Sequence, residues 1–481
     1  MGFLNSAAKR RMALLVALLS LALALLVGPL LPFALPPAAA SYKSSDPSTS
    51  IVGSPGLPGS TERARLVAFG RQVFNDDTLS VGRNMSCATC HSIASGGTAA
   101  DDRSNRLLGL HPGSVFKSYA LPASAANTFA WRNIQSNAYA VFSPPLHRSH
   151  AADGSVQMVG GNFWDGRALG FLTGRPTQEQ ATVPPLGTLE QGLPAPACVV
   201  ARVVQRDRAH PYPISYASLF GTALERVQWP NDLEKLCNQS DNVVDMPNPV
   251  DQGRVQRAYS NISLALWAYQ HSAEIVPFSS RFDAYSQGKL TLSAAEQRGL
   301  SLFNGKAKCA SCHVSTVAKG VPAALFTDFS YDNLGIPRNP DNPIYNFPMI
   351  NPDGRQWVDL GLGGVLLHQD TLRDQIEPNM GKFKVPTLRN VDRRPSSTFV
   401  RSYMHNGYFR SLEQVVDFYN SRDTKPRCGD PFTSVEKAEE QGCWPEPELA
   451  TTVNRTELGN LGLSAAEQAD LVSFLKTLSD A

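Results

Sequence analysis

The sequence lacks an excess of charge of either sign. Its 481 residues include 44 Lys and Arg against 42 Asp and Glu, and charged residues make up only 18% of the chain. Removing the basic residues Lys9, Arg10 and Arg11 at the N-terminus leaves 41 basic against 42 acidic residues. Such a balance predicts no nucleic-acid partner and no binding to a membrane through a polybasic surface. The length suits about two globular domains.

Cysteine and histidine are scarce, with 8 and 9 residues, but they gather in two short motifs. These are Cys87-Ala88-Thr89-Cys90-His91 and Cys309-Ala310-Ser311-Cys312-His313. No second ligand pair at zinc-finger spacing follows either motif, which argues against zinc. Cysteines three residues apart on a helical turn share one face, so both thiols can reach one porphyrin, and the next histidine can bind its iron. C-x-x-C-H therefore predicts two covalently bound c-type haems, with a redox C-x-x-C pair as the competing interpretation.

The first forty residues differ from the rest of the chain. Lys9, Arg10 and Arg11 precede an apolar run from Met12 to about Leu31, and small residues follow at 38–41. This order is typical of a secretory signal peptide, predicted here over residues 1–40, with an uncleaved membrane anchor as the alternative. Either interpretation predicts export to the bacterial periplasm, where c-type haem is attached. Residues 41–60 are rich in Ser, Pro and Gly and predict a flexible leader.

Four cysteines lie outside the haem motifs. An even number of cysteines in an oxidising compartment favours two disulfides. Nearest neighbours close the shortest loops, so the favoured pairs are Cys198–Cys237 and Cys428–Cys443, although the sequence leaves the connectivity open.

Helical patterns dominate, and no stretch indicates an extensive sheet. Apolar spacing predicts helices over residues 61–74, 255–275 and 412–419, and capping boxes at Ser293–Glu296 and Ser464–Glu467 predict two more helix starts. The two haem motifs are too far apart for one small cytochrome fold. The prediction is a mainly α protein with long loops and two cytochrome c-like haem domains, 61–285 and 286–481.

At this point the chain resembles the bacterial dihaem cytochrome c peroxidase and MauG superfamily. The resemblance covers about residues 61–480. It rests on both haem motifs and on three further segments, residues 163–168 (FWDGRA), 383–391 (FKVPTLRNV) and 403–420, which contain YMHNG and LEQVVDFYN. In that family the N-terminal haem is the peroxide site and the C-terminal haem relays or stores electrons.

The resemblance implies roles for four residues around the first haem. Trp164 matches an aromatic residue between the haems, where an oxidisable ring would divide one long electron transfer into two shorter ones. Glu190 matches an acid–base glutamate that moves a proton between the peroxide oxygens, and Gln180 and Pro184 line the same pocket. Gln191 stands where the family commonly has methionine, and the connection between Arg167 and Gln180 is longer than usual.

The sixth ligand of the second haem separates the branches of the family. Peroxidases have a methionine fourteen residues after the histidine of Tyr-x-His-x-Gly, whereas this chain has Tyr419 at that distance from His405. MauG-like members also have tyrosine there, and an anionic oxygen ligand favours oxidised iron. Tyr419 is the favoured ligand, with Met404 or Met380 as alternatives, and the MauG-like branch is favoured.

The resemblance also implies a calcium ion held by Asn133 and by backbone carbonyls near Val400 and Ser402. His111 does not match the family's distal-histidine loop, so the first haem is expected to be five-coordinate and open to peroxide. The predicted activity is that of a dihaem oxidoreductase that consumes hydrogen peroxide. Its partner is either a small cytochrome or cupredoxin that donates electrons, or a protein whose residues it oxidises. The rival hypothesis is a non-enzymatic dihaem electron-transfer cytochrome.

Overall fold

The computed structural model describes residues 60–99, 101, 111–112, 127–128, 131–150, 154–209, 212–239, 242–348 and 350–481. The predicted signal peptide of residues 1–40 lies outside the described residues. The predicted leader of residues 41–60 does too, except for Ser60, which begins the first described helix. None of the described helices combines the length and apolar character that a membrane span requires.

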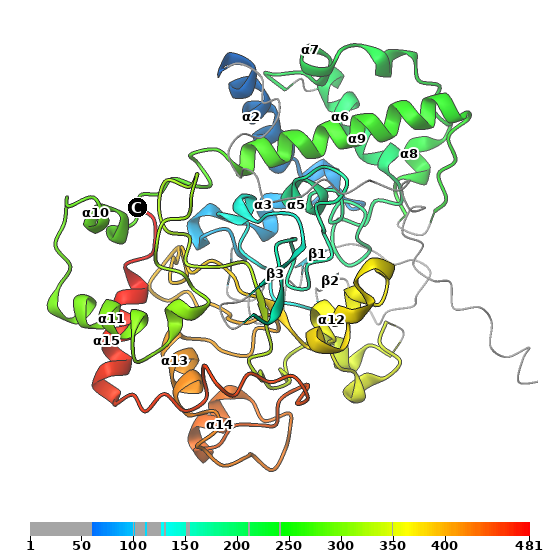
Figure 1. The fold of residues 1–481 in the computed structure, drawn as a ribbon. Coiled ribbons are helices and arrows are strands. Elements are labelled where there is room, and N and C mark those ends of the chain that lie inside the picture. Colours follow the sequence, from blue (N-terminus) through cyan, green and yellow to red (C-terminus); the bar gives the residue numbers. More distant parts are fainter. Residues whose placement is uncertain are drawn as a thin grey trace, which may run out of the picture. The chain divides into compact units, whose positions relative to one another are not determined.

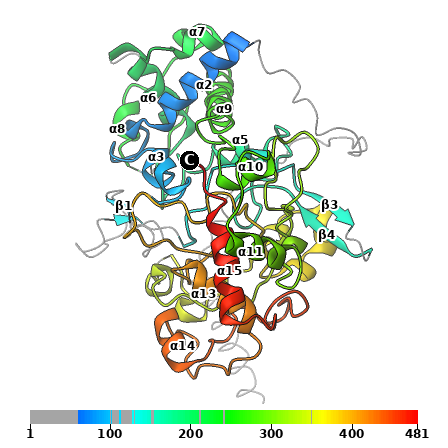
Figure 2. The same cartoon turned by 90° about the vertical axis from the view of Figure 1, so that its left-hand side faces the viewer.

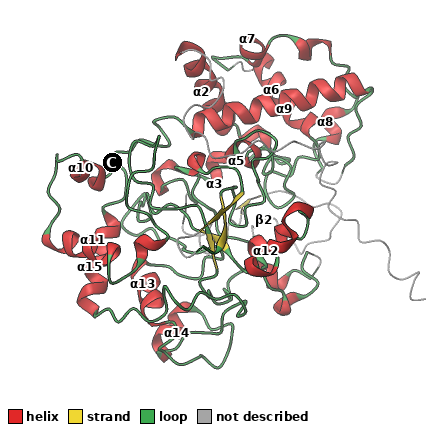
Figure 3. Ribbon diagram, in the orientation of Figure 1, coloured by secondary structure: helices red, strands yellow, loops and turns green. Residues whose placement is uncertain are grey.

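Helices and loops make up almost all of the described chain (Figures 1 and 3). The helices of the first half are α2 (Ser60–Phe74), α3 (Cys87–Cys90), α5 (Pro176–Gln180), α6 (Pro196–Ala209), α7 (Tyr216–Phe220), α8 (Leu233–Leu236) and α9 (Pro249–Gln270). Those of the second half are α10 (Arg281–Ser286), α11 (Ala294–Asn304), α12 (Gly361–Leu366), α13 (Leu412–Ser421), α14 (Val435–Gln441) and α15 (Ala465–Lys476).

Strands occur only as three short antiparallel pairs in the described residues. They are β1 (His111–Pro112) with β2 (Asn127–Thr128), β3 (His147–His150) with β4 (Val156–Val159), and β5 (Tyr331–Asp332) with β6 (Phe383–Lys384). The predicted mainly α class with little sheet is confirmed.

Side-chain caps set the helix starts that the sequence predicts. Ser293 and Ser464 each accept a hydrogen bond from the backbone of the glutamate three residues on, and that glutamate accepts from the serine N–H, so both capping boxes are formed. Helix α9 differs from its prediction of 255–275. It begins at Pro249 because Asn248 caps it and proline suits the first turn, and it ends at Gln270.

The helix that precedes each haem motif crosses a later helix at a glycine. In the second half α11 crosses α15, and a Cβ at Gly299 would collide with the carbonyl oxygen of Asp470 and lie 2.8 Å from the Cβ of Phe474. In the first half α2 crosses α9, and a Cβ at Gly70 would collide with the carbonyl oxygen of Ala265. Figure 2 shows both pairs side by side. Each crossing therefore leaves no room for a side chain at the glycine.

Buried apolar side chains form two large clusters. One draws on residues 66–276 together with Leu325, and the other on residues 282–478. The domain boundary near residue 285 falls between the two ranges and stays a prediction.

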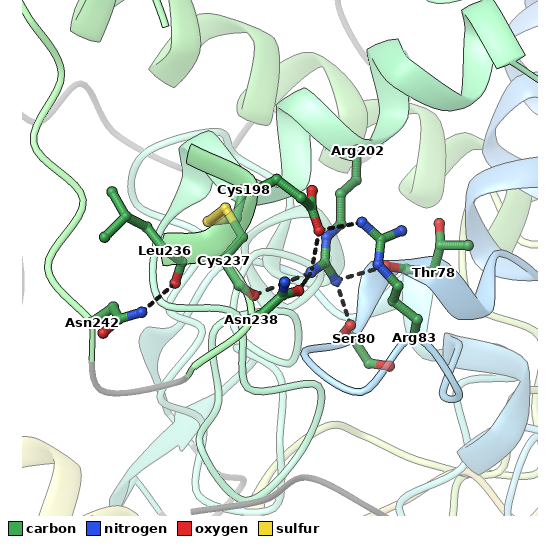
Figure 4. The surroundings of a disulfide bond; sticks show 10 residues. Thr78, Ser80, Arg83, Cys198, Arg202, Leu236, Cys237, Asn238 and Asn242 are labelled. Atoms are coloured by element: carbon green, nitrogen blue, oxygen red, sulfur yellow. Dashed lines mark hydrogen bonds and ion pairs between the residues drawn. A yellow bond between two sulfur atoms is a disulfide. The ribbon is translucent and has the colours of Figure 1, made fainter. Parts of the chain in front are cut away.

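Both favoured disulfides are confirmed, Cys198–Cys237 and Cys428–Cys443. The first lies beside Arg202, whose buried guanidinium donates to the carbonyl oxygens of Thr78 (2.9 Å) and Cys237 (3.1 Å) (Figure 4). Arg202 thereby fixes the segment that leads into the first haem motif onto helix α6, and the disulfide joins the end of α8 to the same helix.

We predict opposite effects for alanine at two helical glycines. Gly299→Ala should lower the free energy of unfolding by about 2 kcal/mol, because the new methyl group forces α11 away from α15. Gly253→Ala is the matched control, since a Cβ there meets only the Arg257 side chain, 3.6 Å away, and should raise stability by about 0.5–1 kcal/mol. Denaturant unfolding of both variants measures the difference. Equal effects would show that the crossing tolerates a side chain.

Candidate functional site: two haem-attachment motifs and the residues between them

The first motif forms a single helical turn. Ser86 caps α3, its backbone N–H donating to Thr89 Oγ1 over 3.0 Å, and the N–H of His91 donates to the carbonyl oxygen of Cys87 over 2.9 Å. The turn thereby places Cys87, Cys90 and His91 together, as attachment to one porphyrin requires.

The second motif repeats this geometry with a tighter turn. A short 3-10 helix, η6 (Cys309–Ser311), carries it, and the N–H of His313 donates to the carbonyl oxygen of Cys309 over 2.9 Å. The two motifs therefore present the same three groups in the same local order.

A backbone carbonyl orients each motif histidine. Nδ1 of His91 lies 2.9 Å from the carbonyl oxygen of Gly97, and Nδ1 of His313 lies 2.9 Å from that of Phe326. Burial lowers the pKa of both rings, which favours neutral imidazole with its proton on Nδ1. Nε2 then keeps its lone pair for a metal, the arrangement that metal-binding histidines need.

The motif cysteines are not in disulfides, whereas the other four cysteines are. Burial raises the pKa of the Cys87 and Cys309 thiols to about 12. A reactive redox C-x-x-C pair needs a lowered thiol pKa, so the redox interpretation does not suit these sites. Covalent attachment to haem does suit them.

A cavity of about 230 Å³ adjoins the second motif. Cys309, Cys312 and His313 line it, and so do Trp164 and Tyr419. Most of the lining is apolar, as a porphyrin ring requires, and the imidazole of His313 lies in its wall. The residues present therefore fit a haem bound through Cys309, Cys312 and His313.

Trp164 lies between segments from the two halves of the chain. Its indole Nε1–H donates to the carbonyl oxygen of Asn133 (2.8 Å), and its own carbonyl accepts from the N–H of Lys384 (2.8 Å). The ring is half-buried and lines the cavity of the second motif. A residue that resemblance alone placed between the haems thus has contacts on both sides.

Glu190 belongs to a loop that docks beside the first motif. The loop turns on itself, with the N–H of Glu190 bonded to the Gly187 carbonyl (2.8 Å) and the N–H of Gln191 to that of Pro184 (3.2 Å). Burial raises the pKa of Glu190, opposed by the Arg167 guanidinium, and the Glu190 charge in turn raises the pKa of the Cys87 and Cys90 thiols. This coupling indicates that Glu190 is near the first motif.

The same loop brings Gln180 and Pro184 close to Glu190 in one run of turns. Gln180 ends α5, and its carbonyl accepts from the N–H of Val183 (3.0 Å). Gln191, the departure from the family pattern, is buried and donates to the carbonyl oxygen of Leu79 (3.0 Å), which anchors the loop to the segment before Cys87. Gln191 therefore has a structural role that its position in the sequence did not reveal.

The longer connection between Arg167 and Gln180 folds around Glu179. Its carboxylate accepts hydrogen bonds from the N–H groups of Gly170 (2.7 Å), Leu172 (2.8 Å) and Thr173 (2.9 Å). These bonds give the extra residues a defined conformation without displacing Gln180 from the Glu190 loop.

Among the three candidate sixth ligands, Tyr419 and Met404 line the cavity of the second motif. Met380 is not among the lining residues and packs against Gly363, with its Sδ 2.7 Å from where a Cβ of that glycine would lie. Tyr419 projects from α13, which the sequence predicts as a helix, and is half-buried. Its role as ligand stays a prediction.

The segments implied for calcium do meet. The Asn133 amide Nδ2 donates to the carbonyl oxygens of Ser402 (3.0 Å) and Met404 (3.1 Å). A calcium ion needs oxygen ligands, so the amide would have to turn to present its oxygen. The present arrangement does not fit the ion, and calcium stays a prediction.

Two features escape the sequence analysis because their partners lie far apart in the chain. Arg132 is buried between Asp165 (2.5 Å) and Asp359 (2.7 Å). Lys384 is also buried, donating to the carbonyl oxygen of Gly160 (2.5 Å), and burial lowers its pKa to about 7. Arg132 adjoins Asn133, and Lys384 lies within the FKVPTLRNV segment, but neither sequence pattern identifies the residues that these two side chains bind.

These features define a class of protein, a dihaem c-type cytochrome with a tryptophan in the wall of one haem cavity and a glutamate near the other motif. A family model described as di-haem cytochrome c peroxidase matches residues 64–291. The methylamine utilization protein MauG of Paracoccus denitrificans is 30% identical over 432 residues, covering 88% of this chain and 92% of the relative. Cytochrome-c peroxidase IdrP1 of a Pseudomonas species is 26% identical over 457 residues, covering 92% and 88%.

A solved structure shares this fold and much of its length. The diheme peroxidase BthA from Burkholderia thailandensis is 27% identical with a TM-score of 0.60, covering 88% of this chain and 87% of that chain. The chain belongs to the di-haem cytochrome c peroxidase and MauG family. It is a dihaem oxidoreductase of the peroxidase type, and both the predicted family, with its MauG-like branch, and the predicted enzyme class are confirmed. Membership implies two c-type haems.

We predict that two haems remain on the polypeptide after denaturation. The variant with Cys87→Ser and Cys90→Ser should retain one, because only the second motif can then form thioether bonds. A variant with Cys428→Ser and Cys443→Ser, which lacks a disulfide only, should retain two. Pyridine haemochrome counts on denatured protein measure this, and a count of one in the unaltered protein would exclude the assignment.

Proposed function

We propose that the protein is a periplasmic dihaem enzyme that uses hydrogen peroxide as oxidant, of the MauG-like kind. Residues 61–285 would carry the peroxide haem on His91, and residues 286–481 the electron-transfer haem on His313. The observation that carries the proposal is that Trp164 and Tyr419 line the same cavity as Cys309, Cys312 and His313. The N-terminal segment, by its charged and apolar regions, supports export.

The haems would supply the iron that donates electrons to peroxide, and the chain's residues would manage protons and electrons around them. Glu190 would take the proton from the peroxide oxygen nearer the iron and deliver it to the farther oxygen, which leaves as water. Its raised pKa suits that exchange, because a carboxyl group that titrates closer to neutral pH both accepts and donates readily. Gln180 and Pro184 would shape the pocket.

Trp164 and Tyr419 would handle the second oxidising equivalent. Trp164 would pass one electron from the His313 haem towards the His91 haem through its ring. Tyr419 would give the second iron an anionic oxygen ligand, which favours its oxidised states. The pair of haems could then hold two oxidising equivalents. These would oxidise residues of a partner protein or, as the second candidate, be reduced by electrons from a small redox protein.

A non-enzymatic electron-transfer cytochrome is the rival function. It requires a strong sixth ligand on both irons, and the Glu190 loop offers none beside the first motif. A high-spin ferric signal from one haem in the resting protein supports the enzyme. Two low-spin signals, with no reaction on adding peroxide, support the rival.

We predict that Glu190→Gln slows peroxide consumption by on the order of 10²-fold, because the amide cannot accept the proton. Haem content and the resting spectrum should not change, since the Glu190 backbone, not its carboxylate, makes the loop's hydrogen bond to Gly187. Stopped-flow mixing with peroxide measures the rate. An unchanged rate would assign proton transfer to another group.

We predict that Tyr419→Met keeps both haems but changes the spectrum of the low-spin haem. It should also abolish any long-lived peroxide-oxidised form of the fully ferric protein. Met404→Leu is the control, because Met404 lines the same cavity. Magnetic circular dichroism of the ferric variants identifies the ligand. A spectrum altered by Met404→Leu and not by Tyr419→Met would make the methionine the ligand.

A further inference from the structure

A buried cluster of three charged side chains adjoins Trp164. Arg132 donates to Asp165 through Nη1 (2.5 Å) and to both oxygens of Asp359 through Nε (2.7 Å) and Nη2 (2.8 Å). The side chains of Arg132, Asp165 and Asp359 are 12%, 8% and 5% exposed. Ions buried to this degree are costly to keep unless each has a partner, so the three hold one another in place.

The cluster is built directly onto the frame of the indole. Asp165 follows Trp164 in the chain, and Arg132 precedes Asn133, whose carbonyl accepts the indole Nε1–H. The N–H of Asn133 in turn donates to the carbonyl oxygen of His405 (2.7 Å). The position of the ring therefore depends on where Arg132 is held.

The charges in the cluster do not cancel. Burial acts to raise the pKa of Asp165, but Arg132 and Arg167 outweigh it and lower that pKa to about 2, and Arg132 likewise lowers the pKa of Asp359. Both carboxylates are therefore ionised at neutral pH around a single buried guanidinium. Arg167, the second partner of Asp165, has a side chain that is 34% exposed, so water screens its charge more strongly.

Glu448 and His405 also lie near Asp359, and His405 Nε2 is 3.8 Å from Glu448 Oε2. The Glu448 carboxylate accepts the N–H of Asp359 (3.1 Å), which adds negative charge on the far side of the cluster. Lys384 donates its amine hydrogen bonds to Ser143 Oγ (3.3 Å) and to the carbonyl oxygen of Gly160, not to the carboxylates of the cluster. The electrostatic potential around the indole is thus negative on the side of Asp165 and Asp359.

The hydrogen-bond partner of the indole decides what happens to its proton. A backbone carbonyl is far too weak a base to take a proton from Nε1, and the nearby carboxylates are occupied by Arg132. An electron that leaves the indole would therefore leave a cation that still carries its Nε1–H, and such a cation needs neighbouring negative charge.

We propose that Asp165 and Asp359, held by Arg132, are positioning residues that orient Trp164 and stabilise it as a cation during electron transfer between the haems. In this step one electron passes from the indole to the oxidised first haem centre. One electron then passes from the second haem to the indole, and no proton moves. The proposal rests on the relay role proposed for Trp164.

Asp165→Asn is the variant that tests the proposal, because it removes one charge and keeps the shape. The readout is the rate of electron exchange between the haems, taken as the rate at which the second haem is oxidised once peroxide has oxidised the first haem of the fully ferric protein, followed by stopped-flow absorption. We expect Asp165→Asn to slow this exchange on the order of tenfold. We expect the wild-type rate to be the same in H₂O and D₂O.

Asp283→Asn is the matched control. Asp283, on helix α10, forms a more deeply buried pair with Arg389 at 2.7 Å, and the hydrogen bonds of its carboxylate come from Arg389 and Ser280. Asp283→Asn should reduce stability at least as much as Asp165→Asn while leaving the rate of electron exchange between the haems unchanged. Equal slowing in both variants would mean that loss of stability is the cause, and would overturn the proposal.

A double-mutant cycle with Trp164→Phe separates the role proposed for the Asp165 charge from the relay role proposed for Trp164. If Trp164→Phe slows exchange and Asp165→Asn adds nothing in that background, Asp165 acts through the indole, as proposed. If Trp164→Phe slows exchange but Asp165→Asn alone does not, the charge cluster is not involved. If Trp164→Phe leaves exchange unchanged, the relay role itself fails. A solvent isotope effect well above one in the wild type would show that a proton moves, and would overturn the cation.

Discussion

A buried guanidinium is the constraint on which the middle of this protein depends. Arg132 lies in a region that excludes water, so it must keep both Asp165 and Asp359, and those residues are 33 and 227 positions away in the chain. Once these contacts form, the Asn133 carbonyl is placed at the Nε1 edge of the Trp164 indole and the Asn133 N–H against the backbone of His405. The two ion pairs of Arg132 thereby align the loop that carries the tryptophan with the segment that lines the second haem cavity.

Glycine at each helix crossing lets the helix before a haem motif pack closely against its partner helix. At Gly70 and Gly299 a side chain would strike the backbone of the opposing helix, so the pre-motif helix can approach its partner only without one. The carbonyls of Gly97 and Phe326 then fix the histidine rings. Haem sites of this kind need rigid presentation of three groups, and the short loops after each motif supply it through backbone contacts.

Sequence patterns anticipated what local chemistry determines. The C-x-x-C-H spacing and the serine–glutamate capping boxes act within a helical turn or two, and the structure contains both. The two disulfides join nearest neighbours among the other four cysteines, 39 and 15 positions apart. The start of α9 was missed because Asn248 and Pro249 precede the apolar stripe on which the prediction relied. Arg132, Lys384 and the anchoring role of Gln191 were missed because their partners are distant in sequence. Only the assembled fold could reveal those pairs.

The residues proposed for proton handling and for electron relay are held by different segments of the chain. Glu190 is held by backbone turns of its own loop and by Gln191 against Leu79, all within the first half. Trp164 is held by Asn133 and Lys384 and lines the cavity of the second half. Arg167 links the two frames, because it forms an ion pair with Asp165, next to Trp164, and also acts to lower the pKa of Glu190. A change of charge at Asp165 is therefore expected to affect Glu190 as well as the indole.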